Sequence, residues 1–502
     1  MNPLSYLEIL KLAAPETFLS VAALAVLFVD LIVMRGEPAS HRRVIATAVS
    51  VVGGFVALCW LLRVPAQASI FGGMLAVDGV TQWVKAVVVV LTLATCVLSM
   101  EEAFTEHVGE FYSLMLLATV GMMFLVSSQD LLMVFVSLEL TSLSLYALTA
   151  FSKGSRASTE AALKYFLFGS VAAAFALFGM SLVYGVAGAT GFTEIAANLR
   201  GKGLDPLLTL AVVMVFVGFG FKIAAVPFHL WAPDAYEGAP TPAAALIASG
   251  SKVASFYVFA KLLAVGFSGL EGAAGWGKFV AGWAPLLATL AAFSMLLGNL
   301  AAIAQGNVRR LLAYSAVAHA GYVLVGMLAL SESAGRRDAF NAVIYYVATY
   351  GLATVGAFGV VAVVQRRTGG ARLEDFVGLS RRAPGLALCL MIFVLSLAGI
   401  PPLAGFFGKF YLFTAAAGVG GKVGMMWLII FALAMSSVSL YYYLQWLKRA
   451  YVSPAPEGAE PWVLTVAERV VLAVLALAVL ILGTLPDLLV GRLDAAAKVA
   501  GF

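Results

Sequence analysis

Long apolar runs separated by short polar loops fill almost the whole chain. A helix needs about 20 mainly apolar residues to cross the hydrocarbon core of a bilayer, and each run is close to that length. The runs cover residues 15–34, 44–62, 79–100, 111–127, 129–151, 159–186, 205–230, 241–266, 280–303, 308–329, 338–364, 384–415, 423–447 and 466–489. The pattern predicts an all-α integral membrane protein of about fourteen transmembrane helices.

Composition agrees with this pattern and gives the chain an orientation. Hydrophobic residues make up 62% of the chain and charged residues only 11%, which excludes a water-soluble protein. The net charge of +5 is spread over short loops, so it does not indicate nucleic acid. Basic residues favour the loops after odd-numbered runs: Arg35, Arg42, Arg43, Lys153, Arg156, Arg309, Arg310, Arg366, Arg367, Arg372, Arg381, Arg382, Lys448 and Arg449. The positive-inside rule therefore predicts cytoplasmic odd-numbered loops and periplasmic termini.

The sequence contains a faint internal repeat. Residues Asp130–Glu139 align with Arg310–His319, and Ala174–Gly179 align with Thr354–Gly359, in both cases about 180 residues apart. Five helices separate the copies, so the second begins from the opposite side of the membrane, as in the inverted repeats of transporters. The predicted segments are a three-helix N-terminal segment at 1–110, repeats at 111–270 and 271–450 (helices 4–8 and 9–13), and a C-terminal helix 14 at 451–502.

Proline interrupts the seventh and twelfth runs at corresponding places. The seventh contains Gly218–His229 (GFGFKIAAVPFH), and the twelfth contains Ala398–Lys409 (AGIPPLAGFFGK). Because proline lacks a backbone donor and clashes with the preceding turn, we expect both helices to be discontinuous. Paired broken helices in the two halves of a membrane protein indicate a transport site.

Five ionisable side chains occupy mid-run positions: Glu139, Lys222, Lys252, His319 and Lys409. An ionisable group at the bilayer centre costs from ~3 to more than ~10 kcal/mol, so each is a functional candidate. A desolvated lysine can exchange its proton, and a nearby carboxylate modulates that exchange. We therefore predict a proton-transfer path in which a Glu139–Lys222 ion pair forms and breaks, and the remaining residues pass the proton onward.

Structural roles compete with this interpretation. Any of these lysines could serve a purely structural contact, and a helix–helix hydrogen bond explains His319 as well as a relay role does. The Lys164 side chain could reach out to the membrane surface, or it could add a step to the proton-transfer path. Four charged residues nearer the ends of runs are expected to be interfacial anchors: Lys85, Lys261, Glu468 and Arg469.

The loop from His229 to Pro242 is rich in polar and turn-forming residues. It could be a capped turn before the next helix. It could also be a proton entry near the cytoplasmic surface that uses His229, Asp234 and Glu237. We favour the structural role for Asp234 and leave both roles open for His229 and Glu237.

No cofactor motif accompanies these groups. The sequence has no Walker motif, no GxGxxG loop and no haem or iron–sulfur ligand pattern, and its three cysteines lack CxxC spacing. We expect no cofactor and no metal in this chain. The driving force for transport would come from an ion gradient or from a partner subunit.

Three stretches resemble the antiporter-like membrane subunits of NADH:quinone oxidoreductase (respiratory complex I). They are Phe228–Pro242 (FHLWAPDAYEGAPTP) followed by Ser251 and Lys252, the opening Ala14–Leu31, and Ser127–Phe151. Within the family, YEGAPTP and a lysine at 409 are similar to the subunit N branch. The resemblance extends over essentially the whole chain. It implies fourteen helices, the inverted repeats and proton transfer through Glu139, Lys222, Lys252 and Lys409.

The resemblance also implies a setting. FMN, the iron–sulfur clusters and the NADH and quinone sites would belong to other subunits of a proton-pumping translocase, with no redox active site in this chain. The neighbours would be the antiporter-like subunit M, the small membrane subunits A, J and K, and the lipid of a bacterial inner membrane, with no nucleic acid. Alternatives are a subunit of a multisubunit sodium/proton antiporter, a non-pumping scaffold, or the same module in a hydrogenase-like complex.

Overall fold

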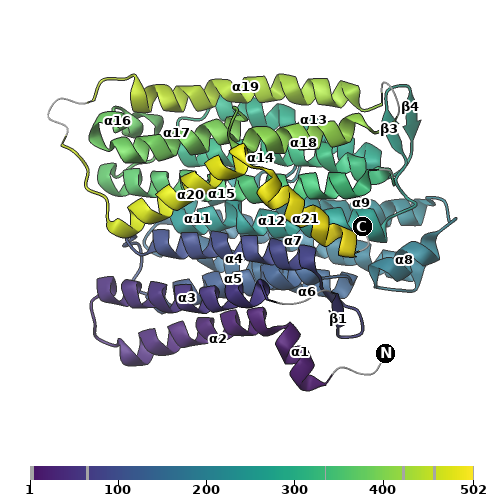
Figure 1. The fold of residues 1–502 in the computed structure, drawn as a ribbon, viewed down its shortest axis with the longest axis horizontal. Coiled ribbons are helices and arrows are strands. Elements are labelled where there is room, and N and C mark those ends of the chain that lie inside the picture. Colours follow the sequence, from purple (N-terminus) through teal and green to yellow (C-terminus); the bar gives the residue numbers. More distant parts are fainter. Residues whose placement is uncertain (1–4, 64–66, 334, 421–423, 456–459, 501–502) are drawn as a thin grey trace.

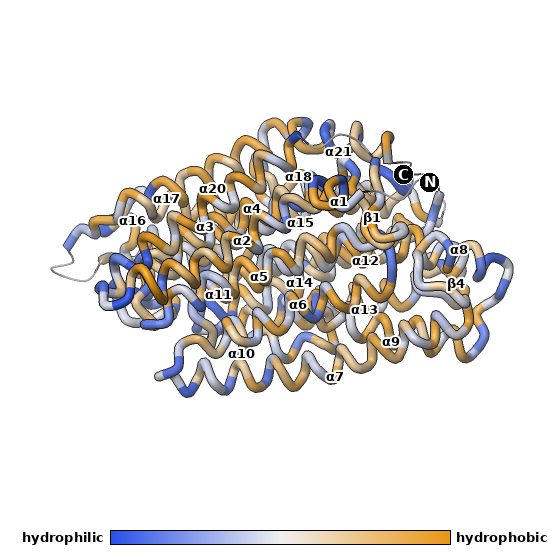
Figure 2. Tube along the Cα trace, turned by 90° about the horizontal axis from the view of Figure 1, so that it is seen from below, coloured by the Kyte–Doolittle hydropathy of each residue, from blue (hydrophilic) through white to orange (hydrophobic). Residues whose placement is uncertain are grey.

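The computed structural model is one bundle of helices that run side by side along a common direction (Figure 1). It describes residues 5–63, 67–333, 335–420, 424–455 and 460–500. Hydrophobic residues fill the length of the bundle, and hydrophilic residues gather at its two ends (Figure 2). Both ends of the chain lie at the same end of the bundle, beside α8 (Phe192–Leu199).

The helices of the bundle follow the apolar runs. They are α2 (Ala14–Phe28), α3 (Ala39–Leu61), α4 (Gly79–Ser99), α5 (Val108–Ser127), α6 (Leu131–Thr149), α7 (Arg156–Ala187), α9 (Pro206–Ile223), α10 (Trp231–Gly238), α11 (Thr241–Ala248), α12 (Gly250–Lys261), α13 (Trp283–Ile303), α14 (Val308–Met327), α15 (Arg336–Thr368), α17 (Pro384–Ala398), α18 (Ala404–Ala417), α19 (Met426–Tyr451) and α20 (Val466–Thr484). In the described part of the chain, 13 helical spans are long and apolar enough to cross a membrane. The twelfth expected span is not in this set because it is divided between two shorter helices, α17 and α18. The predicted fold class is confirmed.

Short polar side chains begin many of these helices. Asp130 accepts hydrogen bonds from the free backbone N–H groups at the start of α6, and Asn307 does the same for α14. Asp78, Ser155, Asp205 and Thr465 cap α4, α7, α9 and α20 in the same way. Such caps satisfy donors that have no partner within the helix, which fixes where each span starts.

Matching backbone contacts in the two halves reveal the repeat. The N–H of Leu131 donates to the carbonyl of Thr190, and the N–H of Val308 donates to the carbonyl of Ala371. Asp130 also forms an isolated β-bridge with Gly191, as Asn307 does with Arg372. The segments that follow α7 and α15, marked by α8 and α16 (Leu379–Arg382), lie at opposite ends of the bundle, which is the inverted arrangement (Figure 1).

This pairing corrects the register of the predicted repeat. The caps match Asp130 with Asn307, whereas the sequence alignment had matched it with Arg310, three residues further on. Glu139 therefore does not correspond to His319. The alignment failed because both segments are apolar, and many registers of two apolar helices score alike.

Several elements were not predicted. A short helix α1 (Tyr6–Leu12) precedes the first span, and α21 (Asp487–Ala500) follows α20. Two hairpins join spans, β1 (Ala68–Ile70) with β2 (Leu75–Val77) and β3 (Ala273–Gly275) with β4 (Lys278–Val280). The hairpins, α8 and α21 all lie at the end of the bundle that carries both termini (Figure 1).

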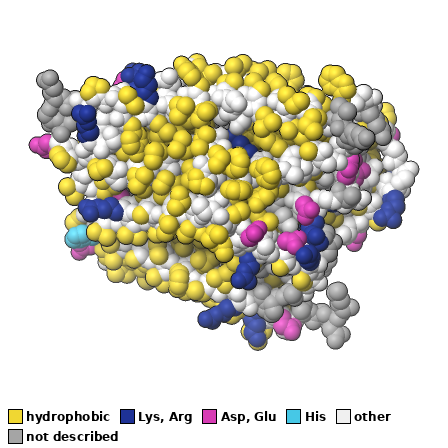
Figure 3. Space-filling model, turned by 45° about the horizontal axis from the view of Figure 1, so that its top comes forward, with side chains coloured by type: hydrophobic (Ala, Val, Ile, Leu, Met, Phe, Trp, Pro, Cys, Tyr) yellow, Lys and Arg dark blue, Asp and Glu magenta, His cyan; other side chains and the backbone are white. Residues whose placement is uncertain are grey.

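Burial divides the helices into a centre and a rim. The apolar windows of the α11–α12 span and of α15 are completely buried, whereas only 33% of the windows of α2, α3, α7, α19 and α20 is buried. The outward faces of the rim helices are apolar, and hydrophobic side chains cover much of the surface in Figure 3. Such a surface fits lipid or other membrane subunits.

Candidate functional site

The first broken helix ends in the middle of the bundle. α9 stops at Ile223, and Ala224 takes a left-handed conformation (φ 57°) before the chain turns into α10. The break leaves helix carbonyls without an internal donor. Lys252 of α12 donates to the carbonyl of Ile223 at 3.2 Å and to that of Ala316 in α14 at 3.3 Å.

The second broken helix repeats this arrangement. α17 stops at Ala398, and Gly399 takes the left-handed conformation (φ 86°). Lys409 of α18 donates to the carbonyl of Ala398 at 2.9 Å and to Ser436 Oγ at 2.8 Å. The Lys409 amine lies so close to Gly399 that a Cβ there would approach it to 3.1 Å.

In each repeat, then, an ammonium group lies at the carboxyl end of a half-helix. That end carries partial negative charge from its unpaired carbonyls, which stabilises a cation. The side chains of Lys252 and Lys409 are 1% and 6% exposed. Among the described residues neither forms an ion pair with a carboxylate; backbone and hydroxyl groups hold the two amines, and the centre of the Tyr322 ring lies 4.9 Å from that of Lys409.

His319 of α14 lies between these two lysines. Its Nδ1 is 2.6 Å from the hydroxyl of Tyr346, its Nε2 is 3.1 Å from the hydroxyl of Tyr443, and both lysines are within electrostatic range of the ring. Tyrosine hydroxyls can donate and accept, so both histidine nitrogens have partners that can take or give a proton. The sequence did not indicate these two tyrosines, because many tyrosines occur in the apolar runs.

Lys222 and Glu139 lie nearer the surface of the chain. Lys222 donates to Ser142 Oγ and lies 5.7 Å from the centre of the Tyr146 ring. Glu139 is close enough to act on Lys222 electrostatically, but the two form no ion pair in this structure. Both side chains are partly exposed, and Glu139 shares its face of α6 with the exposed Val136. Glu139 thus lies near the middle of α6, as its position in the run predicts, but on a face that this chain does not fully cover.

The loop after the first break forms a charged network at the end opposite the termini. Asp234 binds Arg310 at 2.7 Å and Lys164 at 2.8 Å, and Glu237 binds Arg310 at 2.9 Å. Asn307 donates to Glu237 at 2.9 Å. Although burial raises the pKa of Asp234, the hydrogen bonds from Lys164 and Arg310 outweigh it and hold that pKa below its usual value.

These contacts place the remaining candidates. Lys164 neither reaches the membrane surface alone nor extends into the centre, because it joins Asp234 and Glu160. His229 is half-buried in the break, and its Nδ1 has no hydrogen-bond partner in the described part of the chain. Asp234, for which a simple turn role was favoured, is the centre of the network that fastens α10 to α7 and α14.

Three of the four expected interfacial anchors are buried instead. Lys85 forms an ion pair with Glu16 of α2 at 2.6 Å, and both are almost fully enclosed. Glu468 is buried and pairs with Arg366. Lys261 is 3% exposed. Only Arg469 is exposed at a helix end as expected.

Within the described residues, no group of three or more histidine, cysteine, aspartate or glutamate side chains could hold a metal ion. The groups around the two breaks, namely Lys252, His319, Lys409 and their hydrogen-bond partners, thus include amines, an imidazole and hydroxyl groups. These groups can hold and pass protons.

Comparison with known proteins gives one consistent result. Residues 128–438 match the family model for the transmembrane part of NADH:quinone oxidoreductase and Mrp antiporters. NADH-quinone oxidoreductase subunit N 2 of Acidobacterium capsulatum is 50% identical over 97% of this chain and 99% of its own length.

Solved structures agree. A chain of respiratory complex I from Thermus thermophilus is 33% identical, with a TM-score of 0.76 over 96% of this chain and all of its own length. A chain of the Mrp complex from Dietzia sp. DQ12-45-1b has a TM-score of 0.80 over 98% of this chain and 97% of its own, at 21% identity, and shares the fold.

Proposed function

From the premise that this chain belongs to the subunit N family of NADH-quinone oxidoreductase, the antiporter-like membrane subunits of complex I, we propose that it carries protons across the membrane. The protons would move along the row formed by Lys222, Lys252, His319 and Lys409, driven by quinone reduction in other subunits. Glu139 would modulate the first lysine of the row.

The observation that carries this proposal is the pair of lysines at the breaks, where Lys252 and Lys409 donate to the last carbonyls of α9 and α17. A structural cation in the bundle would be expected to have a carboxylate partner, because an unpaired buried charge costs several kcal/mol. Among the described residues the hydrogen-bond partners of Lys252 and Lys409 are carbonyl and hydroxyl groups, which satisfy an ammonium group without fixing its charge. Such an amine can lose its proton at a small cost, as a relay group requires.

The order of the row follows from its contacts. Lys222 precedes Ile223, whose carbonyl binds Lys252; Lys252 also reaches the carbonyl of Ala316, one turn before His319. Protons would enter near His229 and Glu237, where the Asp234 network meets solvent, with Lys164 holding that network in place. By the positive-inside rule, the basic loops would put this end in the cytoplasm and both termini in the periplasm of a bacterial inner membrane.

The setting is part of the same proposal. FMN, the iron–sulfur clusters and the quinone site would lie in partner subunits. The neighbours would be subunit M and the small membrane subunits A, J and K. The partly exposed face of α6 that carries Glu139 and Val136 is suited to contact one of these neighbours, because a carboxylate facing lipid alone would be unfavourable.

The test compares two substitutions at Lys409 in the assembled complex, using inverted membrane vesicles. Lys409→Met removes the amine, whereas Lys409→Arg keeps a permanent positive charge that cannot be released. Both are expected to lower the number of protons pumped per NADH, while NADH oxidation by an artificial acceptor stays normal. The exposed Lys202→Met is the matched control.

Full pumping by Lys409→Arg would mean that only the charge matters and would overturn the relay role. Full pumping by Lys409→Met in assembled complex would favour a scaffold. Sodium-dependent proton flux without NADH or quinone would favour an antiporter.

A further inference from the structure

Lys261, which the proton path does not use, is a buried cation that lies within electrostatic range of Asp78 but makes no hydrogen bond or ion pair with any described residue. It is the last residue of α12, directly before a π-helical turn at Leu262–Gly266, and its side chain is 3% exposed. The ring of Tyr257 lies 5.9 Å from its amine. A buried ammonium group that stays charged without a partner is strongly unfavourable unless a ligand compensates its charge.

A cavity of about 610 Å³ opens onto this amine at the end of the bundle that carries the termini. Besides Lys261, its lining includes Arg336, Arg337 and the carboxylates of Asp78 and Asp338. Arg336 is fixed at the rim because it donates to the carbonyls of Leu330 and Ala264 at 3.1 Å. The cavity therefore presents three cations, of which the innermost is unpaired.

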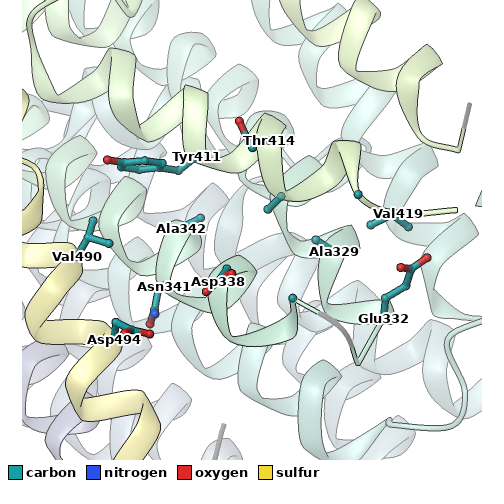
Figure 4. Close-up of a pocket in the computed structure, with 13 residues that line it drawn as sticks. Ala329, Glu332, Asp338, Asn341, Ala342, Tyr411, Thr414, Val419, Val490 and Asp494 are labelled. Carbon is teal, nitrogen blue, oxygen red and sulfur yellow. The ribbon is translucent and has the colours of Figure 1, made fainter. Parts of the chain in front are cut away.

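A second cavity of about 430 Å³ adjoins the first and shares Gly335 and Asp338 with it. Figure 4 shows residues of its lining, among them Asp338 and Asn341 of α15, Tyr411 of α18 and Asp494 of α21, which lies beside Asn341. Asp494 pairs with Arg337 at 3.0 Å. Asp338, at the junction, has no hydrogen bond or ion pair with the described residues, so a free carboxylate and a free ammonium both line the first cavity.

We propose that these adjoining cavities bind a phosphoethanolamine headgroup, with its phosphate on Lys261 and its ammonium on Asp338. Phosphate oxygens accept hydrogen bonds from an amine and from an arginine rim. The free carboxylate at the junction matches an ethanolamine ammonium and would disfavour a headgroup that carries negative charge alone. The apolar side chains that continue the second cavity, such as Val419 and Val490, would adjoin the start of a lipid chain.

The source of the headgroup is either a bilayer phospholipid or a soluble phosphoethanolamine. Binding to the folded chain raises its thermal stability by mass action. The thiol of Cys96 in α4 is fully buried, so its alkylation on heating, followed by mass spectrometry of its peptide, reports unfolding of this chain alone. The measurement uses the purified, delipidated complex, to which phosphatidylethanolamine, phosphatidylglycerol or soluble phosphoethanolamine is added.

We expect phosphatidylethanolamine to raise the alkylation temperature of the native chain more than phosphatidylglycerol does. Lys261→Met removes an unpaired charge, so it should fold, and it should lose most of the gain; the control Lys202→Met should keep it. Asp338→Asn should retain binding of both lipids but lose the preference between them. An equal gain from soluble phosphoethanolamine would assign the site to a soluble ligand.

Two results would overturn the proposal. One is an equal gain from phosphatidylethanolamine in the native chain and in Lys261→Met. The other is a stronger gain from phosphatidylglycerol than from phosphatidylethanolamine in the native chain. Because the readout is stability, neither result depends on whether the chain moves protons.

Discussion

Lys85 and Lys252 are both buried lysines, yet their replacement by methionine should have opposite consequences. Lys85 has a carboxylate partner, Glu16, at 2.6 Å. Lys252 has two carbonyl partners, those of Ile223 and Ala316. Lys85→Met should destabilise the chain and Lys252→Met should not, although only Lys252 belongs to the proposed proton path.

The magnitudes follow from what each substitution leaves behind. Lys85→Met leaves the Glu16 carboxylate buried and uncompensated, which costs ~3–5 kcal/mol. Lys252→Met leaves the terminal carbonyl of Ile223 without a donor, at ~1–3 kcal/mol, whereas the carbonyl of Ala316 keeps its partner within α14. It also removes a buried ammonium whose desolvation costs several kcal/mol, so the two effects nearly cancel.

Alkylation of the buried Cys96 thiol during heating of the purified complex measures both variants in the same chain. Lys85→Met should expose the thiol at a clearly lower temperature than the native chain, and Lys252→Met at about the same temperature. Adding Glu16→Gln to Lys85→Met removes the orphaned charge and should recover most of the loss. Proton pumping per NADH should fall in Lys252→Met despite its normal stability.

The reverse order of stability would refute this reasoning. If Lys252→Met unfolded well below the native chain while Lys85→Met did not, the carbonyl contacts would be the stronger interaction and Lys252 would be a structural residue. A double variant no more stable than Lys85→Met alone would show that the loss comes from packing and not from the charge of Glu16.

Two further predictions concern other parts of the bundle. Burial raises the pKa of the Glu102 carboxyl, in the loop after α4, from its ordinary value of 4.5 to about 7. A carboxyl pKa raised by folding stabilises the folded chain in acid, and this contribution is lost as pH rises through both pKa values. Glu102→Gln should therefore flatten the pH dependence of thermal unfolding and raise the stability of the folded chain by ~3 kcal/mol above about pH 8. An unchanged pH profile would contradict this. Gly405→Ala would drive a methyl group into the Ser396 carbonyl at the second break and should lower both stability and pumping, whereas Gly385→Ala, with open space at its Cβ, should change neither.

Hydropathy predicted the spans well because the membrane imposes length and composition on each of them. The breaks in the seventh and twelfth spans were predicted from proline, whose effect on a helix is local. The elements that were missed, α1, α8, α21 and the hairpins, are short and lie outside the apolar runs, where no such constraint acts.

The register of the inverted repeat could not be predicted from apolar sequence. The existence and inverted sense of the repeat could be predicted, but its register could not, because interchangeable apolar residues give no fixed points. The residues that define the register are Asp130 and Asn307. Their sequences do not look related, but each caps the start of a helix and forms a matching backbone bridge, so they occupy the same position in the two repeats.

Position along a run predicted the depth of Lys252, Lys409, His319 and Glu139 in the membrane. It could not predict that Glu139 lies on a partly exposed face, because depth in the membrane does not say which face of a helix looks outward. On a helix that is apolar all round, no periodicity separates an inner from an outer face. Val136 is as hydrophobic as its buried neighbours, yet it is exposed beside Glu139.

The failure at Lys85 and Lys261 has a different cause, and it is the more instructive one. Distance from the end of a helix measures distance from water only if nothing covers that end. Here α8, α21 and the β1–β2 hairpin lie over the ends of α4 and α12, and Gly79, the first residue of α4, lies against Ala496 of α21. The covering elements turn two positions that would be interfacial on bare helices into interior ones. A charge there needs a partner, and Lys85 has one in Glu16. Lys261 has none among the described residues, and this difference between the two lysines is the observation from which the headgroup site is proposed.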